Sequence, residues 1–279
     1  MEIVRANNSG FCFGVRRAVD MVSRLLEKKE GPIYTIGPII HNPDMVRLLE
    51  EKGVIPVEDV KEVVRGTVVF RTHGILKEEE DYIRSKRIKA IDATCPFVKR
   101  VRKEACKLKK SGYKVVIVGD REHQEVKSIL SYVGNDGIVI EHPQEIKGKK
   151  IGIVSQTTQS REVLKKVVDR LLETAEEIKV VNTICEAVER RLKEAISIAE
   201  IADVMIVVGG KESSNTKKLF KAVKNVRPRS YHVENEEDLD PLWFKGVRVV
   251  GLTGGTSTPD FIMDRVYYRI KNVCGGKDG

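Results

Sequence analysis

A short apolar strand, a polar turn and a cysteine are predicted in the stretch Ala90-Ile91-Asp92-Ala93-Thr94-Cys95. A helix is expected to follow from Val98 to Lys110. The same order of strand, turn, cysteine and helix occurs at Cys12 and at Cys185. These two copies run from Glu2-Ile3-Val4-Arg5-Ala6 to a helix near Val15 to Leu26, and from Val180-Val181-Asn182-Thr183-Ile184 to a helix near Val188 to Ala199. The cysteines are 83 and 90 residues apart, so the repeating unit has the size of a small domain.

Each copy continues with two more strands, and each strand ends in small or polar residues before a helix. The second strands are Ile33 to Gly37, Val115 to Gly119 and Val204 to Gly209, and the third strands begin at Val68, Ile151 and Val247. Strands that alternate with helices at this spacing indicate βαβ units with parallel sheets. We therefore predict an α/β fold of three pseudo-symmetric βαβ-type lobes with mostly parallel sheets around a central cavity.

The cysteine positions set the expected boundaries between the lobes. The first lobe is predicted to span 13–95 and the second 96–184. The third is predicted to span 185–279, with the strand in residues 1–12 joining its sheet.

Composition and charge exclude several classes of protein. Apolar residues make up 41% and charged residues 33% of the 279 residues, which argues against disorder. No apolar run is long enough for a transmembrane helix, and the N-terminus lacks the pattern of a signal peptide. The net charge of +9 favours acidic or phosphorylated partners, but no long basic block is present. We expect a cytoplasmic monomer that binds neither nucleic acid nor a membrane.

The five cysteines include no Cys-x-x-Cys pair. Cys106 and Cys274 are interpreted as small apolar residues. The repeated cysteines each precede a helix, where unpaired N–H groups and the helix dipole favour the thiolate. Three thiolates at equivalent positions indicate a metal site on Cys12, Cys95 and Cys185. Thiolates suit both zinc and iron–sulfur clusters, and the cysteine count alone leaves that choice open.

Polar residues after the predicted strands are the candidates for the rest of the site. They are His41, His73, His123, Glu125, Thr157, Ser213, Ser214, Asn215 and Ser257. The hydroxyl-rich helix starts at Ser213 and Ser257 are typical of anion sites, and with the histidines they fit a diphosphate. A buried carboxyl such as Glu125 could donate protons in a reductive step.

The ordered motifs along the chain resemble one known family. They are Gly10-Phe11-Cys12-Phe13-Gly14-Val15, Gly37-Pro38-Ile39-Ile40-His41-Asn42-Pro43, Thr72-His73-Gly74, Asp92-Ala93-Thr94-Cys95-Pro96, Gln156-Thr157-Thr158, Thr183-Ile184-Cys185, Ser213-Ser214-Asn215 and Ser257-Thr258-Pro259. The sequence is similar to the 4-hydroxy-3-methylbut-2-enyl diphosphate reductases, the LytB-type iron–sulfur oxidoreductases that end the methylerythritol phosphate pathway of isoprene biosynthesis.

The resemblance implies a three-lobed fold around a [4Fe–4S] cluster held by Cys12, Cys95 and Cys185, with one open iron for the substrate hydroxyl. Two electrons and two protons would remove that hydroxyl and give isopentenyl and dimethylallyl diphosphate. The implied diphosphate ligands are His41, His73, His123, Ser213, Ser214, Asn215 and Ser257. His123 and Glu125 would act in catalysis, with Glu125 relaying protons and Thr157 beside the hydroxyl. A ferredoxin or flavodoxin would supply the electrons.

The sequence departs from the family pattern at a few positions. Val188 and Leu192 stand where the family usually has Thr and Gln, and Arg102 stands where a histidine is common. The family's Gly-His-Pro-Glu-Val motif reads Glu122-His123-Gln124-Glu125-Val126 in this sequence.

Two other functions are compatible with the residues. A cluster-bearing sensor would bind a phosphorylated metabolite without forming product. A zinc hydrolase of phosphorylated compounds would hold zinc in place of an iron–sulfur cluster.

Overall fold

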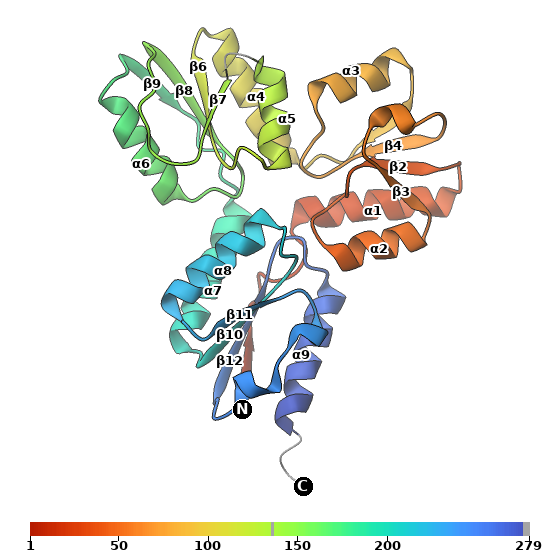
Figure 1. Ribbon diagram of the computed structural model, residues 1–279, viewed down its shortest axis with the longest axis vertical. Helices are drawn as coiled ribbons and strands as arrows, with labels where there is room; N and C mark the ends of the chain where they lie inside the picture. The colour runs from red at the N-terminus through yellow and green to blue at the C-terminus, as the bar shows by residue number, and fades with distance from the viewer. Residues whose placement is uncertain (135–136, 276–279) are drawn as a thin grey trace. The chain divides into compact units, whose positions relative to one another are not determined.

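Three four-stranded sheets, all of parallel strands, form the frame of the protein in this computed structural model (Figure 1). The structure describes residues 1–134 and 137–275. The predicted α/β fold with mostly parallel sheets is therefore confirmed, and the central cavity stays a prediction. In the described chain, no helix is both apolar enough and long enough to span a membrane.

The first sheet has the strand order β3-β2-β4-β5. Its strands are β2 (Ile33–Ile36), β3 (Val54–Val57), β4 (Thr67–Phe70) and β5 (Lys89–Asp92), and the helices of this stretch are α1 (Phe13–Lys28), α2 (Pro43–Glu51) and α3 (Lys77–Ser85). A short 3-10 helix, Val60–Glu62, precedes β4.

The second sheet has the order β7-β6-β8-β9. It contains β6 (Lys114–Val118), β7 (Gly137–Ile140), β8 (Lys150–Ser155) and β9 (Glu177–Val180), with α4 (Pro96–Lys110), α5 (Gln124–Val133) and α6 (Arg161–Leu172).

The third sheet has the order β1-β12-β10-β11, so the first strand of the chain pairs with the last. It contains β1 (Glu2–Arg5), β10 (Val204–Val208), β11 (Ser230–Val233) and β12 (Val249–Gly254), with α7 (Glu186–Ile201), α8 (Ser214–Val226) and α9 (Asp260–Gly275). Two 3-10 helices, Glu236–Asp238 and Pro241–Phe244, lie between β11 and β12.

The three sheets share one topology, in which each strand has a counterpart in the other two sheets. The two central strands are β2 and β4 in the first sheet, β6 and β8 in the second, and β10 and β12 in the third. The outer strands that lead to the cysteines are β5, β9 and β1. The other outer strands, β3, β7 and β11, were not predicted. The third copy was predicted to be extended from Val180, whereas β9 ends there. The residues of β9 are mostly exposed, and two of the four are charged, so the apolar signal of a strand is weak.

Consecutive apolar residues on the central strands point to opposite faces of the sheet and bury both of them, as a parallel sheet covered by helices requires. On β6, Val115 and Ile117 pack in one core with α4 and α5. Val116 and Val118 pack on the opposite face with α6. All four side chains are fully buried. This double coverage fixes the carboxyl end of β6, from which His123 and Glu125 follow.

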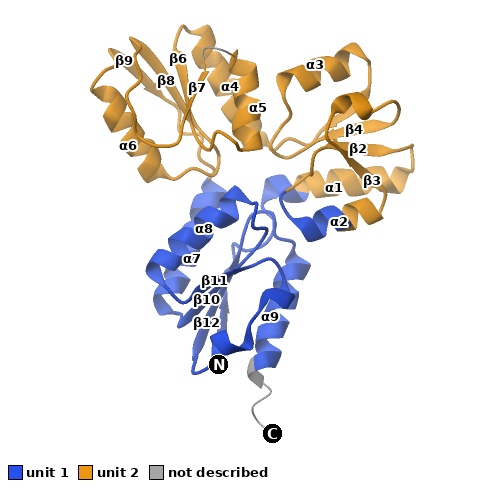
Figure 2. Cartoon of the chain, viewed as in Figure 1, with its two compact units in different colours: residues 1–16, 41–47, 186–279 blue, residues 17–40, 48–185 orange. Residues whose placement is uncertain are grey.

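The chain divides into two compact units (Figure 2). Unit 1 comprises 1–16, 41–47 and 186–279 and contains the third sheet. Unit 2 comprises 17–40 and 48–185 and contains the first and second sheets. The lobe boundaries at 95/96 and 184/185 stay predictions.

Asp203 ties the start of β12 to the loop before β10, and this contact gives the fold a pH-dependent element. Its carboxylate accepts hydrogen bonds from the N–H groups of Arg248 (2.8 Å) and Val249 (2.9 Å). These two bonds lower the pKa of Asp203 in the folded protein. The stabilisation is thus present above the unfolded-state pKa of about 3.9 and disappears as the pH falls through the lower folded-state pKa.

We expect Asp203→Ala to lower the melting temperature at pH 7, and we expect the difference from wild type to narrow below about pH 4. Thermal unfolding followed by circular dichroism between pH 2 and 8 measures this. Asp169→Ala, on the exposed side of α6, is the control. A difference that stays constant with pH would contradict the role of the Asp203 carboxylate.

Candidate active site

The same main-chain hydrogen bond positions each of the three repeated cysteines. In every copy, the cysteine N–H donates to the carbonyl of a threonine in the loop after the neighbouring central strand. The three pairs are Cys12 with Thr256 (3.0 Å), Cys95 with Thr72 (3.0 Å) and Cys185 with Thr157 (2.9 Å). The equivalence of the cysteines therefore extends from the sequence pattern to backbone geometry.

Each cysteine lies directly before a helix. Cys95 is the N-cap of α4, with Pro96 in the first helical position, and the carbonyl of Cys12 accepts from the N–H of Arg16 in the first turn of α1. Neither α1 nor α4 has an acidic residue in its first turn. Cys12 and Cys95 are half-buried and Cys185 is buried before α7. Helix N-termini favour thiolates, although α7 has Glu186 and Glu189 in its first turn, and a metal site on the three cysteines stays a prediction.

Two predicted histidines meet in unit 2. The rings of His73 and His123 lie edge to face, with centroids 5.1 Å apart and an interplanar angle of 83°. His73 follows β4, and His123 is the N-cap of α5, where its Nδ1 accepts from the N–H of Glu125 (3.1 Å). The Nδ1 atom of His123 is therefore an acceptor in the cap of α5.

Glu125 and Thr157 form a buried pair in the same unit. The Glu125 carboxylate accepts from both the N–H and the hydroxyl of Thr157, each at 2.7 Å. The residues are 1% and 7% exposed, so bulk water cannot replace these bonds. Thr157 also accepts the Cys185 N–H through its carbonyl (2.9 Å), which links the carboxylate to the turn of a cysteine.

Among the predicted diphosphate ligands of unit 1, Ser257 contacts His41, and the others lie at the start of α8. The Ser257 hydroxyl donates to the His41 carbonyl (3.1 Å). Gly210 allows the close approach of this segment, since a Cβ added there would lie 2.7 Å from the His41 oxygen. Ser213 caps α8, and Asn215 is buried in its first turn. Within the described residues the Asn215 Nδ2 has no hydrogen-bond partner, as expected of a donor reserved for an anion.

The two units thus each hold part of the predicted set. Unit 1 contains Cys12, His41, Ser213, Ser214, Asn215 and Ser257, and unit 2 contains His73, Cys95, His123, Glu125, Thr157 and Cys185. Cys106 lies within α4, half-buried, and the side chain of Cys274 lies outside the described part.

Sequence reasoning did not identify several supporting residues. Thr72 and Thr256 act through their carbonyls, which no side-chain pattern reveals. Gln156 is fully buried, and its Oε1 accepts from the N–H of Asp120 (3.1 Å) in the loop before His123. Arg102, a departure from the family pattern, stacks over Tyr132 at 4.3 Å from the ring centroid.

Comparison with known proteins identifies the family. The sequence profile described as "LytB protein" matches residues 3–271. The chain belongs to the LytB family. This LytB-family chain is 43% identical to the 4-hydroxy-3-methylbut-2-enyl diphosphate reductase of Aquifex aeolicus, over 99% of this chain and 98% of that protein. It is 45% identical to the reductase of the same name from Geobacter sulfurreducens, over the full length of both.

Two solved structures support the assignment of this LytB-family fold. One is described as (E)-4-hydroxy-3-methyl-but-2-enyl diphosphate reductase, the terminal enzyme of the non-mevalonate pathway; it is 43% identical, with a TM-score of 0.75 over 98% of this chain and 100% of that one. The other is the E-1-hydroxy-2-methyl-but-2-enyl-4-diphosphate reductase from Plasmodium falciparum. It is 28% identical, with a TM-score of 0.89 over 96% of this chain and 87% of that one.

The Glu125–Thr157 contact predicts a matched pair of stability effects. Thr157→Val removes the hydroxyl donor and so takes one hydrogen bond from a buried carboxylate, which we expect to cost about 1–3 kcal/mol of unfolding free energy. Thr157→Ser keeps the donor and should retain most of the stability. Urea unfolding measures both variants, and equal losses would show that the hydroxyl contributes little.

Proposed function

We propose that this chain reduces 4-hydroxy-3-methylbut-2-enyl diphosphate to isopentenyl and dimethylallyl diphosphate, the last step of the methylerythritol phosphate pathway. The C–O bond to the hydroxyl breaks, a C–H bond forms, and two electrons and two protons are consumed as the hydroxyl leaves as water. The observation that carries the proposal is the set of three equivalently bonded cysteines in a chain that matches named reductases from end to end.

We infer that Cys12, Cys95 and Cys185 hold a [4Fe–4S] cluster. The donor set fits, because thiolates are the usual ligands of such clusters and each cysteine stands at a helix start. Three ligands leave one iron without a protein thiolate. The cluster would supply the electrons of the reaction, and the remaining steps fall to the protein side chains.

The diphosphate would be bound by His41, His73, His123, Ser213, Ser214, Asn215 and Ser257. The edge-to-face arrangement of His73 and His123 supports this role, because it brings two imidazoles close together, with ring centroids 5.1 Å apart. Asn215 supports it with its buried amide donor, and the start of α8 adds backbone N–H groups.

Glu125 would deliver protons through Thr157. A hydroxyl can accept one proton while it donates another, so the Thr157 Oγ1 can connect the Glu125 carboxyl to the leaving hydroxyl. The second bond, from the Thr157 N–H to Oε1, fixes the plane of the Glu125 carboxyl group and keeps Oε2 aimed at the Thr157 hydroxyl. The Nδ1 of His123 accepts the backbone N–H of Glu125, so it caps the helix that carries the carboxylate.

An acidic ferredoxin or flavodoxin is the proposed electron donor, because the chain carries a net charge of +9. A monomer in the cytoplasm is the state in which we expect it to act.

We expect Mössbauer spectra of anaerobically purified, iron-57-labelled protein to show a cubane cluster with one distinct iron that shifts when the substrate is added. Cys95→Ser should lose most of the cluster, while Cys106→Ser, within the same helix region, should retain it. Absence of iron after anaerobic reconstitution, with zinc bound instead, would overturn the proposal and favour a hydrolase.

Replacing the proposed proton donor should reduce turnover while leaving substrate binding in place. We expect Glu125→Gln to lower kcat by about 100-fold or more, the usual contribution of a positioned acid. Glu122→Gln, in the exposed turn three residues earlier, is the control and should keep full activity. Anaerobic product analysis measures both variants; normal turnover by Glu125→Gln would remove this residue from the mechanism.

A further inference from the structure

Arg71 carries a buried guanidinium at the end of β4, two residues before His73. The side chain is 8% exposed, and its Nε donates to the carbonyl of Gly74 (3.0 Å). The N–H of Gly74 donates in turn to the carbonyl of Arg71 (3.0 Å). These two bonds close the Arg71–Gly74 turn from both sides, so they restrain the backbone that carries His73.

The same guanidinium reaches a second turn. Its Nη2 donates to Oε1 of Gln124 (3.0 Å), the first residue of α5. Gln124 lies between His123 and Glu125. One charged side chain therefore joins the loop after β4, in the first sheet, to the start of α5 after β6, in the second sheet. Both segments belong to unit 2.

Contacts further along α5 seat the helix on the Arg71–Gly74 turn. The Ser128 hydroxyl donates to the carbonyl of Ile75 (2.7 Å). A Cβ added at Gly74 would lie 2.7 Å from the Ser128 oxygen, so this approach needs a glycine. The Ser128 contact fixes the distance between helix and turn, and the Gln124 contact fixes the rotation of the helix start.

Gly37, at the end of β2, leaves the space that the guanidinium occupies, because a Cβ there would lie 2.9 Å from Nη1 of Arg71. Burial lowers the pKa of Arg71, yet a guanidinium remains charged at neutral pH. A charged donor makes a stronger hydrogen bond than a neutral one, so the bond to Gln124 is well suited to hold two segments together.

We propose that Arg71 and Gln124 are positioning residues that hold His73 and His123 in their edge-to-face arrangement and thereby set the affinity for the diphosphate. This inference rests on the proposed function, in which the two histidines bind that group. It assigns the pair no part in the reduction itself. Its loss should therefore raise KM and the dissociation constant of inorganic diphosphate, while kcat changes little.

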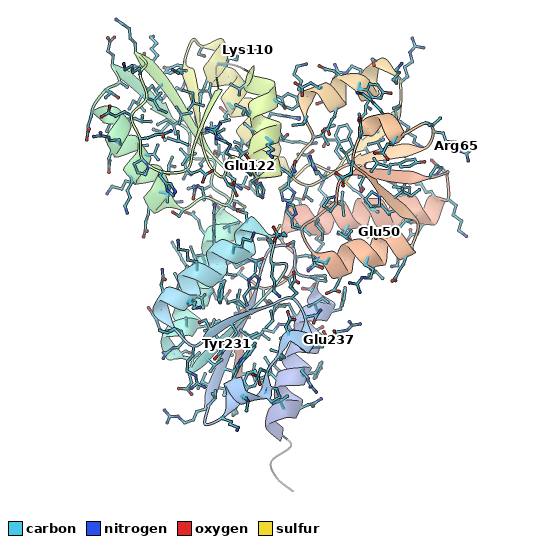
Figure 3. The ribbon with its side chains drawn as sticks, viewed as in Figure 1. Glu50, Arg65, Lys110, Glu122, Tyr231 and Glu237 are labelled. Carbon is cyan, nitrogen blue, oxygen red and sulfur yellow. The ribbon has the colours of Figure 1, made fainter. Side chains whose placement is uncertain are left out.

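Gln124→Met tests the proposal in the cluster-loaded enzyme. It removes the acceptor, keeps the length of the side chain, and affects only a half-buried residue, so folding should be preserved. Lys127→Met is the matched control, because it removes a bond on the same helix, from Nζ to Glu122 (2.7 Å; Glu122 is labelled in Figure 3). Steady-state kinetics give KM and kcat, and calorimetric titration gives the affinity for inorganic diphosphate.

We expect Gln124→Met to raise KM and the diphosphate dissociation constant about fivefold, consistent with the loss of one hydrogen bond, with kcat within about twofold of wild type. Lys127→Met should match wild type in all three. Unchanged KM and diphosphate affinity in Gln124→Met, equal changes in the control, or wild-type protein that binds no diphosphate would each overturn the inference. Diphosphate binding that weakens in Gln124→Met, in a protein that forms no product, would support the inference and refute the proposed reaction.

Discussion

The hydrogen bond from each cysteine N–H to a threonine carbonyl is the constraint on which the site depends. It fastens the turn that carries the thiol to the loop after the adjacent central strand, and it does so in all three copies. A substitution can remove a side-chain contact, whereas a main-chain hydrogen bond between the segments after two neighbouring strands is set by the register of the sheet. The sulfur positions are consequently properties of the fold rather than of local side-chain packing.

Parallel topology explains why functional side chains collect where they do. In each sheet the carboxyl ends of the two central strands lie next to each other, so the loops that follow them start side by side. Glu125 and Thr157 lie in the segments that follow β6 and β8, which are neighbouring strands of one sheet, and their two hydrogen bonds of 2.7 Å follow from that adjacency. Helix starts after these loops supply N–H groups, which favour thiolates and anions alike.

The sequence allowed the repeat, the three cysteine turns and the long helices to be predicted, because each depends on a local pattern of apolar residues followed by polar ones. The outer strands β3 and β11 escaped notice because each has only four residues, half or fully exposed in the middle. The bond between Arg71 and Gln124 could not be predicted either. It joins residues 53 positions apart, and it exists only because α5 packs on the Arg71–Gly74 turn.

The pairing of β1 with β12 has a consequence for how the protein is made. Glu2 lies beside Val249, so β1 has no partner in its sheet until β12 has been synthesised. The first and second sheets, in contrast, use strands that follow one another closely and can form during translation. The turn of Cys12 therefore lacks its partner loop while the turns of Cys95 and Cys185 can already form, so all three cysteines would be ready for the proposed cluster only once β12 is in place.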